Sequence, residues 1–497
     1  MSQLRPIGNF QKNLKDLTKF LGVEEFTPDI SFTGLTHDSR KVESGDLFLA
    51  LPGGTMHGSK YVDDVIAKGA VAVLTDKQGL LIVGDRIPCI MVDDPRLIAG
   101  DVASWFYQVP FLSLDAVGIT GTNGKTTTSA LLEQLWRMNN RTTGFIGTIG
   151  IAIDGEEFES TFTTPEAADL QSVAATMRER HVRNLVMEVS SHALVQHRMN
   201  GSKFSVAGFT QLTQDHLDFH GTMENYFLAK SKLFLPEFTE KAVVNIDSVH
   251  GRRLFDEAQV DTQSLSRDDK SAQWHYDTYY QLDNGAGYQV VIRGTGGILI
   301  EGRFPLLGLH NLDNGLLAIA LAVNTGVDPL VISANMHSLS APQGRLEPVS
   351  IGQKFIALVD FAHTPDAVTR ALATARQMTH GRLIAVLGCG GDRDKAKRPL
   401  MGQALREGAD FAIFTSDNPR SEDPLVILNE MVGSGTGKNE IVEVERRGAI
   451  AIAVAEADDG DCIIVLGKGH ERGQEINGIK QPFDDRIELA RAIEGLS

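Results

Sequence analysis

The sequence contains little cysteine. Its three cysteines, Cys89, Cys389 and Cys462, are odd in number and far apart in 497 residues. Neither a disulfide framework nor a zinc-ligand spacing can be drawn from them, which is typical of a protein of the reducing cytosol. No apolar run reaches the roughly 18 residues of a membrane span, and the N-terminus lacks the continuous apolar core of a secretory signal. We therefore expect a cytoplasmic protein with no membrane insertion.

Positive charge is also in short supply. Lys and Arg total 47 against 64 Asp and Glu, a net charge of −17. An acidic surface of this kind excludes a general nucleic-acid or anionic-membrane binder, but it leaves room for a local basic pocket that binds a small anion. Hydrophobic residues make up 42% of the chain, enough to bury substantial cores. We expect a monomer whose partners are small molecules.

The length predicts about three domains, and the pattern along the chain sets their bounds at 1–110, 111–343 and 344–497. Short apolar runs alternate with helical segments, which predicts α/β domains with mostly parallel sheets. The Gly-rich stretch around residues 270–305 is predicted to be an antiparallel insertion or edge. Polar residues follow the apolar runs at once, and ligands of such sheets bind beyond the carboxyl ends of the strands. The runs used for this reading are Asp46–Leu51, Ala70–Leu74, Ala116–Thr120, Leu185–Val189, Ala242–Ile246, Phe355–Val359, Leu383–Leu387, Phe411–Phe414 and Ile463–Leu466.

The strongest local motif is Gly121-Thr-Asn-Gly-Lys-Thr-Thr127, between a predicted strand and a predicted amphipathic helix. Consecutive backbone N–H groups at a helix N-terminus form a cradle for anions. Lys125 can reach the outer phosphates of a nucleotide, and the Thr126 hydroxyl can ligate Mg²⁺. Ile119 stands where the usual phosphate loop has its first glycine, so this loop is a shortened relative. A purely structural glycine turn is the alternative.

Several charged residues have two interpretations on residue type alone. Glu188 ends one predicted strand and His216 follows another, both at the sheet edge of the phosphate loop, and each is either a magnesium ligand or part of a structural ion pair. Lys230, in a predicted helix, has the composition of an ordinary surface lysine. The basic run from Arg393 to Arg398 is either a solvated helix start or an anion site. Arg420 closes a turn, and its guanidinium suits bidentate binding of a carboxylate.

Taken together, the motifs resemble those of the Mur ligase family, ATP-dependent enzymes that add amino acids to a peptidoglycan precursor. The resemblance runs over essentially the whole chain and is most like the branch that adds 2,6-diaminopimelate. It implies a UDP-substrate domain, a central ATPase domain and a C-terminal Rossmann-like domain. The motifs are Thr36–Arg40, Gly121–Thr127, Glu188–His192, Asp215–Asp218, Asn311–Asn314, Gly344–Arg345, Asp360–Asp366, Gly388–Asp394, Asp417–Arg420 and Gly467–Glu471.

The resemblance also implies roles for individual residues. Those for the UDP-substrate UDP-MurNAc-L-Ala-D-Glu are His37, Ser39, Gly54, Thr55, Met56, Thr163, Thr164, Ser190, Gln196 and Arg198. Those for ATP are Gly121, Thr122, Asn123, Gly124, Lys125, Thr126, Thr127, Asn311, Arg345 and Asp360. Those for meso-diaminopimelate are Arg393, Asp417, Asn418, Pro419, Arg420, Gly467 and Glu471. Lys125, Lys230, His216 and Glu188 are implied to be catalytic, and Thr126, Glu188, His216 and Lys230 to bind Mg²⁺. For Lys230 this requires a carbamate formed with CO₂, because an ammonium cannot bind a cation.

The implied reaction phosphorylates the D-Glu γ-carboxylate with ATP, and the free amine then attacks the acyl phosphate. Asp360 and His363 are both candidates to assist the amine. Two rival functions remain. A sister ligase such as folylpolyglutamate synthetase shares the nucleotide loop but lacks Asp417–Arg420 and the UDP-binding domain. A phosphate-loop switch protein hydrolyses ATP without an amino-acid acceptor. Phe361 and Ala193 depart from the residues common in the family, tyrosine and glycine.

Overall fold

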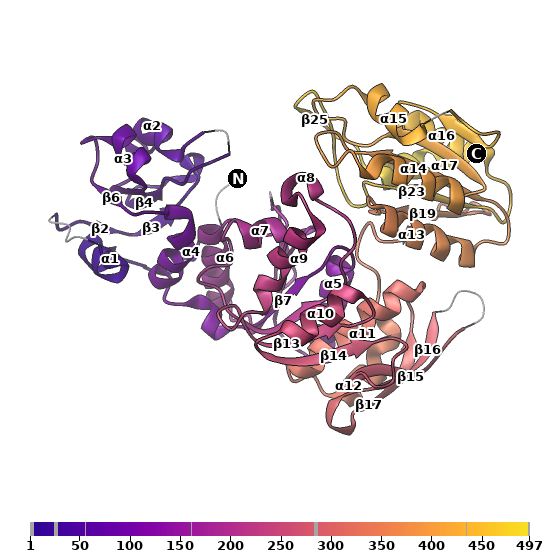
Figure 1. The fold of residues 1–497 in the computed structure, drawn as a ribbon, viewed down its shortest axis with the longest axis horizontal. Helices are drawn as coiled ribbons and strands as arrows, with labels where there is room; N and C mark the ends of the chain where they lie inside the picture. Colours follow the sequence, from indigo (N-terminus) through magenta and orange to yellow (C-terminus); the bar gives the residue numbers. More distant parts are fainter. Residues whose placement is uncertain are drawn as a thin grey trace.

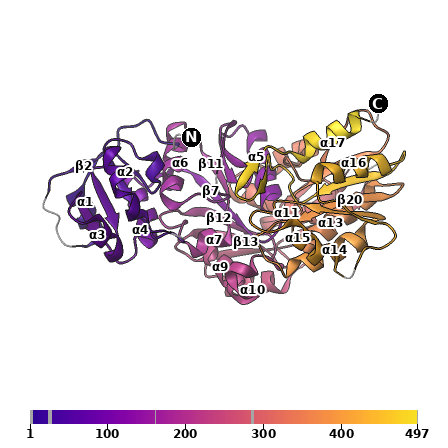
Figure 2. The same ribbon diagram turned by 90° about the horizontal axis from the view of Figure 1, so that it is seen from above.

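The computed structural model describes residues 4–23, 28–54, 56–160, 162–282, 287–433 and 435–495. Its larger sheets have four, eleven and six strands and follow one another along the chain. Figure 1 shows them as three bodies, coloured indigo, magenta to orange, and orange to yellow. In Figure 2 the first and last bodies lie on opposite sides of the central one. Within the described ranges, no helix has the length and apolar character needed to cross a bilayer. The chain is therefore an α/β protein, as the sequence predicts.

The N-terminal body is a parallel sheet covered by helices. Its strands are β3 (Gly34–Thr36), β4 (Asp46–Leu49), β5 (Ala72–Thr75) and β6 (Cys89–Met91), and its helices are α1 (Leu14–Leu21), α2 (Val62–Ala67), α3 (Lys77–Val83) and α4 (Pro95–Phe106). Every residue of β4 and β5 is buried, as expected for parallel strands that are covered on both faces. A two-stranded antiparallel sheet of β1 (Lys12–Asn13) and β2 (Ser31–Phe32) lies beside it.

The central sheet has a parallel middle and antiparallel edges. The parallel strands are β8 (Thr143–Gly147), β11 (Asn184–Glu188), β7 (Asp115–Thr120), β12 (Phe204–Phe209), β13 (Thr239–Asn245), β14 (Asp261–Ser266) and β15 (Trp274–Gln281). The antiparallel edges are β9 (Gly150–Ile153) with β10 (Glu156–Phe158), and β16 (Tyr288–Arg293) with β17 (Leu299–Phe304). The antiparallel edge expected around residues 270–305 is thus confirmed.

Helices cover both faces of the central sheet. They are α5 (Lys125–Met138), α6 (Ala167–Glu179), α7 (Ser191–Val195), α8 (Leu217–His220), α9 (Met223–Ser231), α10 (Val249–Glu257), α11 (Leu309–Asn324) and α12 (Pro329–Asn335). Leu131, Leu132, Leu135 and Trp136 of α5 are buried in one cluster with α11. This packing fixes the start of α5, and hence the glycine loop, against the sheet edge.

The C-terminal body also contains a mostly parallel sheet. Its sheet runs β18 (Glu347–Pro348), β19 (Ile356–Asp360), β23 (Cys462–Leu466), β20 (Leu383–Cys389), β21 (Phe411–Ser416) and β22 (Glu440–Val442), and only β18 is antiparallel. Its helices are α13 (Pro365–Met378), α14 (Lys397–Gly408), α15 (Pro424–Val432), α16 (Arg446–Glu456) and α17 (Asp485–Glu494). A hairpin of β24 (Gln474–Ile476) and β25 (Ile479–Gln481) lies beyond β23.

Candidate active site

The glycine loop lies between β7 and α5, where the sequence predicts it. Gly121 has φ +147° and Gly124 has φ +89°, backbone conformations that favour glycine. A Cβ at Gly121 would lie 1.9 Å from Thr210 Oγ1, so no larger residue fits. The N-terminal N–H groups of α5 open onto this loop and form the anion cradle. Lys125 Nζ donates to the carbonyls of Gly121 and Thr122, both at 2.9 Å.

Glu188 is the polar centre beside the loop. It ends β11, is fully buried, and accepts hydrogen bonds from the Thr126 hydroxyl (3.0 Å), the Thr148 hydroxyl (3.0 Å) and the Thr148 N–H (3.0 Å). Because the carboxylate and the Thr126 hydroxyl meet at the loop, two hard oxygen donors stand where a nucleotide's phosphates would bind. Thr148 was not singled out from the sequence, and no local signal marks it.

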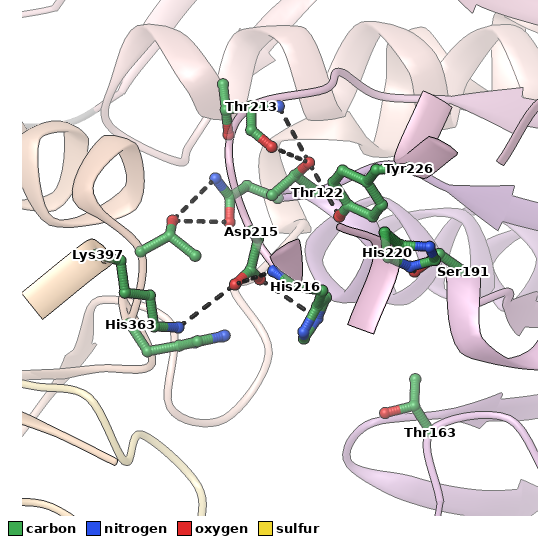
Figure 3. Close-up of polar contacts among 12 residues, drawn as sticks. Thr122, Thr163, Ser191, Thr213, Asp215, His216, His220, Tyr226, His363 and Lys397 are labelled. Carbon is green, nitrogen blue, oxygen red and sulfur yellow. Dashed lines mark hydrogen bonds and ion pairs between the residues drawn. The ribbon is translucent and has the colours of Figure 1, made fainter. Parts of the chain in front are cut away.

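His216 follows β12 in a left-handed conformation, with φ +53°. Its Nε2 lies 3.3 Å from Asp215 Oδ2, but burial outweighs this attraction and lowers the pKa of His216 to about 3. The imidazole is therefore neutral, the form that can donate a lone pair to a metal ion. Asp215 in turn lies 3.3 Å from Lys397 Nζ of α14, which joins the central and C-terminal bodies (Figure 3). The sequence had marked Asp215 only as part of its motif.

Lys230 is buried in α9, with 2% of its surface exposed. Its Nζ donates to the Gly121 carbonyl at 2.7 Å, the same oxygen that accepts from Lys125. Burial, followed by the charge of Lys125, lowers the pKa of Lys230 well below its ordinary value. The composition-based interpretation as a surface lysine is wrong, because α9 packs this position against the loop and not toward solvent.

The C-terminal body supplies the opposite wall of the cavity. Asn418 donates to Glu471 Oε2 at 2.9 Å, and Lys468 Nζ donates to Asn418 Oδ1 at 3.0 Å. Arg420 has φ +53° and donates from Nη1 to the Gly391 carbonyl at 2.6 Å. One cavity is lined from both bodies, by residues that include Lys125, Thr126, Thr163, Glu188, Ser190, His216, Arg393, Asp417, Asn418, Arg420, Gly467 and Glu471.

The basic residues between Arg393 and Arg398 lie in different environments. Arg398 is fully buried and forms ion pairs with Glu422 (2.8 Å) and Glu430 (2.6 Å), while Lys395 pairs with Glu422 at 3.0 Å. A solvated helix start is therefore wrong for Arg398, because α14 directs it into the body. Among the described residues, Arg393 makes a hydrogen bond only to its neighbouring carbonyl, and it lines the cavity, so it remains the candidate for an anion.

A second cavity lies on the other side of the glycine loop. It is lined by Asn123, Gly124, Thr127, Asn311, Arg345 and Asp360, among others. Arg345 Nη2 donates to Thr126 Oγ1 at 3.2 Å, and its Nε is buried without a hydrogen-bond partner among the described residues. An unpaired guanidinium N–H beside the loop is available to an anionic ligand. Asn311 donates to the Leu307 carbonyl at 2.7 Å, which orients its amide.

The remaining expected residues form two groups. Arg198 binds the Thr164 carbonyl (2.9 Å), Gln196 Oε1 (2.7 Å) and Glu166 (3.0 Å), and Thr164 lies 3.4 Å from Ser190 Oγ. The second group lies in the N-terminal body, outside the two cavities described above. His37 Nδ1 is 3.8 Å from Asp169, the Ser39 carbonyl accepts from Lys68, and Gly54 and Met56 lie in a loop. Thr55 lies outside the described residues.

Arg96 connects these two groups. Its guanidinium lies 2.9 Å from Glu166 and 3.2 Å from the Pro52 carbonyl, so it ties the loop of Gly54 to the Arg198 cluster. Neither Arg96 nor Glu166 was singled out, since each looks like an ordinary polar residue next to a proline at the start of a helix. The contact depends on how the two bodies dock, which no local pattern encodes.

Three family models match the chain: Mur ligase family, catalytic domain, over residues 31–107; Mur ligase middle domain over 119–322; and Mur ligase, glutamate ligase domain, over 344–469. A protein from Streptomyces coelicolor named UDP-N-acetylmuramoyl-L-alanyl-D-glutamate--2,6-diaminopimelate ligase is 44% identical, covering 99% of this chain and 98% of its own. The protein of that name from Corynebacterium glutamicum is 41% identical, covering 92% and 90%.

Solved structures with similar folds were also found. A structure titled with that ligase name superposes with a TM-score of 0.66 at 32% identity, covering 96% of this chain and 98% of the other. Mycobacterium tuberculosis folylpolyglutamate synthase in complex with ADP gives 0.63 at 19% identity, covering 75% and 92%. The second likeness concerns the fold alone.

Proposed function

This chain belongs to the Mur ligase family, and from that membership we propose that it adds meso-2,6-diaminopimelate to the D-Glu γ-carboxylate of UDP-MurNAc-L-Ala-D-Glu. The reaction uses ATP and serves peptidoglycan precursor synthesis, and we assign it to the cytoplasm. The observation that carries the proposal is the single cavity that joins the glycine loop and Glu188 to the Arg420 turn. A phosphorylating centre and a site suited to an amino acid thus face the same space.

The chemistry follows from the inertness of a carboxylate toward amines. An oxygen of the D-Glu γ-carboxylate attacks the γ-phosphorus of ATP, the bond to ADP breaks, and an acyl phosphate results. The amine then attacks the acyl carbon, and phosphate leaves. Lys125 and the N–H groups at the start of α5 neutralise the developing phosphate charge, which is the main contribution of a protein to phosphoryl transfer. Arg345 is placed to add to it through its unpaired Nε.

The residues beside the loop fit Mg²⁺. Among the described residues, no three His, Cys, Asp or Glu side chains converge to form a metal cage, but Mg²⁺ commonly takes only one or two protein oxygens and completes its shell with waters and substrate phosphates. Glu188 and the Thr126 hydroxyl supply such oxygens, and neutral His216 lines the same cavity. When bound, Mg²⁺ would neutralise phosphate charge during the transfer.

Lys230 is suited to become a carbamate. Only a neutral amine attacks CO₂, and burial beside Lys125 favours the neutral amine of Lys230. The nitrogen bonds to the CO₂ carbon and a proton is released, which converts a buried amine into an anion. That anion would relieve the repulsion from Lys125 and could join Glu188 and His216 as a metal ligand.

We assign each of the three substrates to its own group of residues. The groups around Arg198 and in the N-terminal body are assigned to UDP-MurNAc-L-Ala-D-Glu, and Asn311, Arg345 and Asp360 to the nucleotide. Arg393, Arg420, Asn418, Asp417, Gly467 and Glu471 are assigned to diaminopimelate. The domain bounds of 1–110, 111–343 and 344–497, and the monomeric state, remain predictions.

The test is phosphate release with ATP, Mg²⁺ and UDP-MurNAc-L-Ala-D-Glu, and with meso-diaminopimelate, L-lysine or L-ornithine supplied one at a time. We expect release with meso-diaminopimelate and little with the other two. A Lys125→Ala variant should lose most of the rate and keep the wild-type melting temperature. Release that needs no amino acid, or near-normal release in that variant, would reject the proposal.

A further inference from the structure

The amine that attacks the acyl phosphate must first lose a proton, and two residues are candidates to take it. The carboxylate of Asp360 already accepts backbone hydrogen bonds. Its two carboxylate oxygens accept the N–H groups of Leu346 and Ala362, each at 2.7 Å. It also lines the cavity on the far side of the glycine loop, away from the Arg420 turn. Asp360 is therefore occupied as a backbone anchor at the end of β19.

His363 differs from Asp360 in both respects. Its Nδ1 lies 2.8 Å from the Phe361 carbonyl, which can only accept a hydrogen bond, so Nδ1 carries the hydrogen. In the neutral ring the lone pair then resides on Nε2, for which no described residue supplies a hydrogen-bond partner. The ring lines the cavity shared by Glu188, Arg393 and Arg420. A fixed tautomer thus presents a proton acceptor between the phosphorylating centre and the amino-acid wall.

The charges around His363 come from several elements. Lys397 of α14 and Arg345 oppose protonation, whereas Asp215, in the loop after β12, favours it. His216 and His363 also repel each other when both are charged. Burial is the largest influence, and together these lower the pKa of His363 to about 4. Figure 3 shows His363 beside Lys397 and Asp215. Substrate phosphate groups at the adjacent loop would add negative charge and raise that pKa.

We propose that Nε2 of His363 accepts the proton of the incoming amine during amide formation. The inference rests on the proposed ligase function. The ammonium group of diaminopimelate first gives one proton to Nε2 and becomes a neutral amine. The amine nitrogen then bonds to the acyl carbon, the bond from that carbon to the phosphate oxygen breaks, and one of the two remaining N–H protons leaves with the phosphate. Asp215 stabilises the imidazolium, and the ring returns its proton to the released phosphate or to water.

The decisive variant is His363→Asn, because the asparagine amide can still donate to the Phe361 carbonyl but has no basic nitrogen. General base catalysis contributes roughly 10²–10⁴-fold, so we expect amide formation to fall at least about 100-fold. Isotope scrambling between the β,γ-bridge and β-nonbridge oxygens of ATP, measured with UDP-MurNAc-L-Ala-D-Glu and without an amine, should stay at the wild-type rate. Trapping of the acyl phosphate by hydroxylamine, which is neutral at pH 7, should also be preserved.

His380→Asn serves as the matched control, since His380 is exposed and follows α13 in the same body. It should behave as wild type. Should His363→Asn fail to fold, His363→Gln makes the same test. Wild-type amide formation in the folded variant, or loss of isotope scrambling together with amide formation, would overturn the role of His363. A wild-type protein that makes no product would instead reject the ligase function itself.

Discussion

At the scale of single residues, the buried Lys230 gives the sharpest expectation. Lys230→Ala should be nearly inactive, because the anion proposed at this position is lost from beside Lys125. Short carboxylic acids such as acetate or propionate should restore part of the rate by filling the space with a new anion. Steady-state phosphate release with and without the added acid measures this. Lys232→Ala, two residues along the chain and only half-buried, should keep its activity.

Two results for Lys230→Ala would contradict the carbamate. Full activity in Lys230→Ala would show that the amine has no chemical role. Activity that is lost but not rescued by any small acid, with an unchanged melting temperature, would favour a role for the ammonium form and not for an anion.

We propose that Arg420 determines the preference for the acceptor. Diaminopimelate has a second carboxylate that lysine lacks, and a guanidinium can hold both of its oxygens in one plane. Arg420 already donates to the Gly391 carbonyl, and its Nε lies 3.5 Å from Glu475 Oε2, so lysine leaves the guanidinium only partly unpartnered. A cost of about 1–3 kcal/mol for a charged group then corresponds to about a five- to 150-fold preference.

Arg420→Ala should raise the KM for meso-diaminopimelate and narrow its advantage over lysine in kcat/KM. Arg420→Lys keeps the charge without the planar fork and should recover little of the preference. An unchanged ratio of kcat/KM values in Arg420→Ala would assign the selection to another residue, with Arg393 the next candidate.

The sequence predicts the position of a residue where chemistry and chain order coincide. Gly121 and Glu188 lie at strand ends, Lys125 begins the helix after one of these strands, and the topology brings strand ends together. Prediction of position fails where burial decides. Lys230 and Arg398 have the composition of surface residues, and only the packing of α9 and α14 buries them. Arg96, Glu166 and Lys397 make contacts between bodies, which depend on docking and carry no local signal.

At the scale of elements, α14 and α15 are joined by Arg398. Its fully buried guanidinium pairs with Glu422 and with Glu430 of α15. Removing one partner of a buried pair costs about 3 kcal/mol, so Arg398→Met should lower the protection of α14 and α15 amides by about that amount. Lys395 pairs with the same Glu422 but is 61% exposed, and Lys395→Met should cost about 0–1 kcal/mol. Native-state hydrogen exchange compares them, and equal losses would contradict this account.

The same pairing predicts an acid dependence. The hydrogen bond from Arg398 is the largest influence on Glu422 and helps to lower its pKa from 4.5 to about 2. A carboxyl whose pKa is lowered by folding stabilises the folded state above its unfolded pKa, and that contribution is lost as the pH falls through the folded value. The melting temperature should therefore fall between pH 4.5 and about 2, and fall less steeply in Arg398→Met. An identical slope in both proteins would show that Glu422 contributes nothing.

The sequence predicts the buried inner strands best, for a physical reason. Inner strands of parallel sheets are covered on both faces and read as continuous apolar runs, so β7, β11, β20 and β23 can be found from composition. Short surface strands lack that signal. The hairpin of β24 and β25, with its exposed second strand, is an example that composition did not reveal.

At the scale of the whole molecule, the cavity is assembled from two bodies. Asn123 of the glycine loop lies 3.1 Å from Asp366, and Lys397 lies 3.3 Å from Asp215, so the C-terminal wall is held against the loop by polar contacts. Each contact joins residues more than 180 positions apart in the chain. This arrangement places the glycine loop and the Arg420 turn on the walls of one cavity.

In the proposed reaction, ATP activates a carboxylate, which then becomes an amide with diaminopimelate. The most direct test uses UDP-MurNAc-L-Ala-D-Glu labelled with ¹⁸O in the γ-carboxylate, together with ATP, Mg²⁺ and meso-diaminopimelate, and follows all products by mass spectrometry. The account predicts ADP, a product whose mass is the sum of the two substrates less one labelled water, and one ¹⁸O atom in the released phosphate. Unlabelled phosphate, or AMP with pyrophosphate, would contradict it.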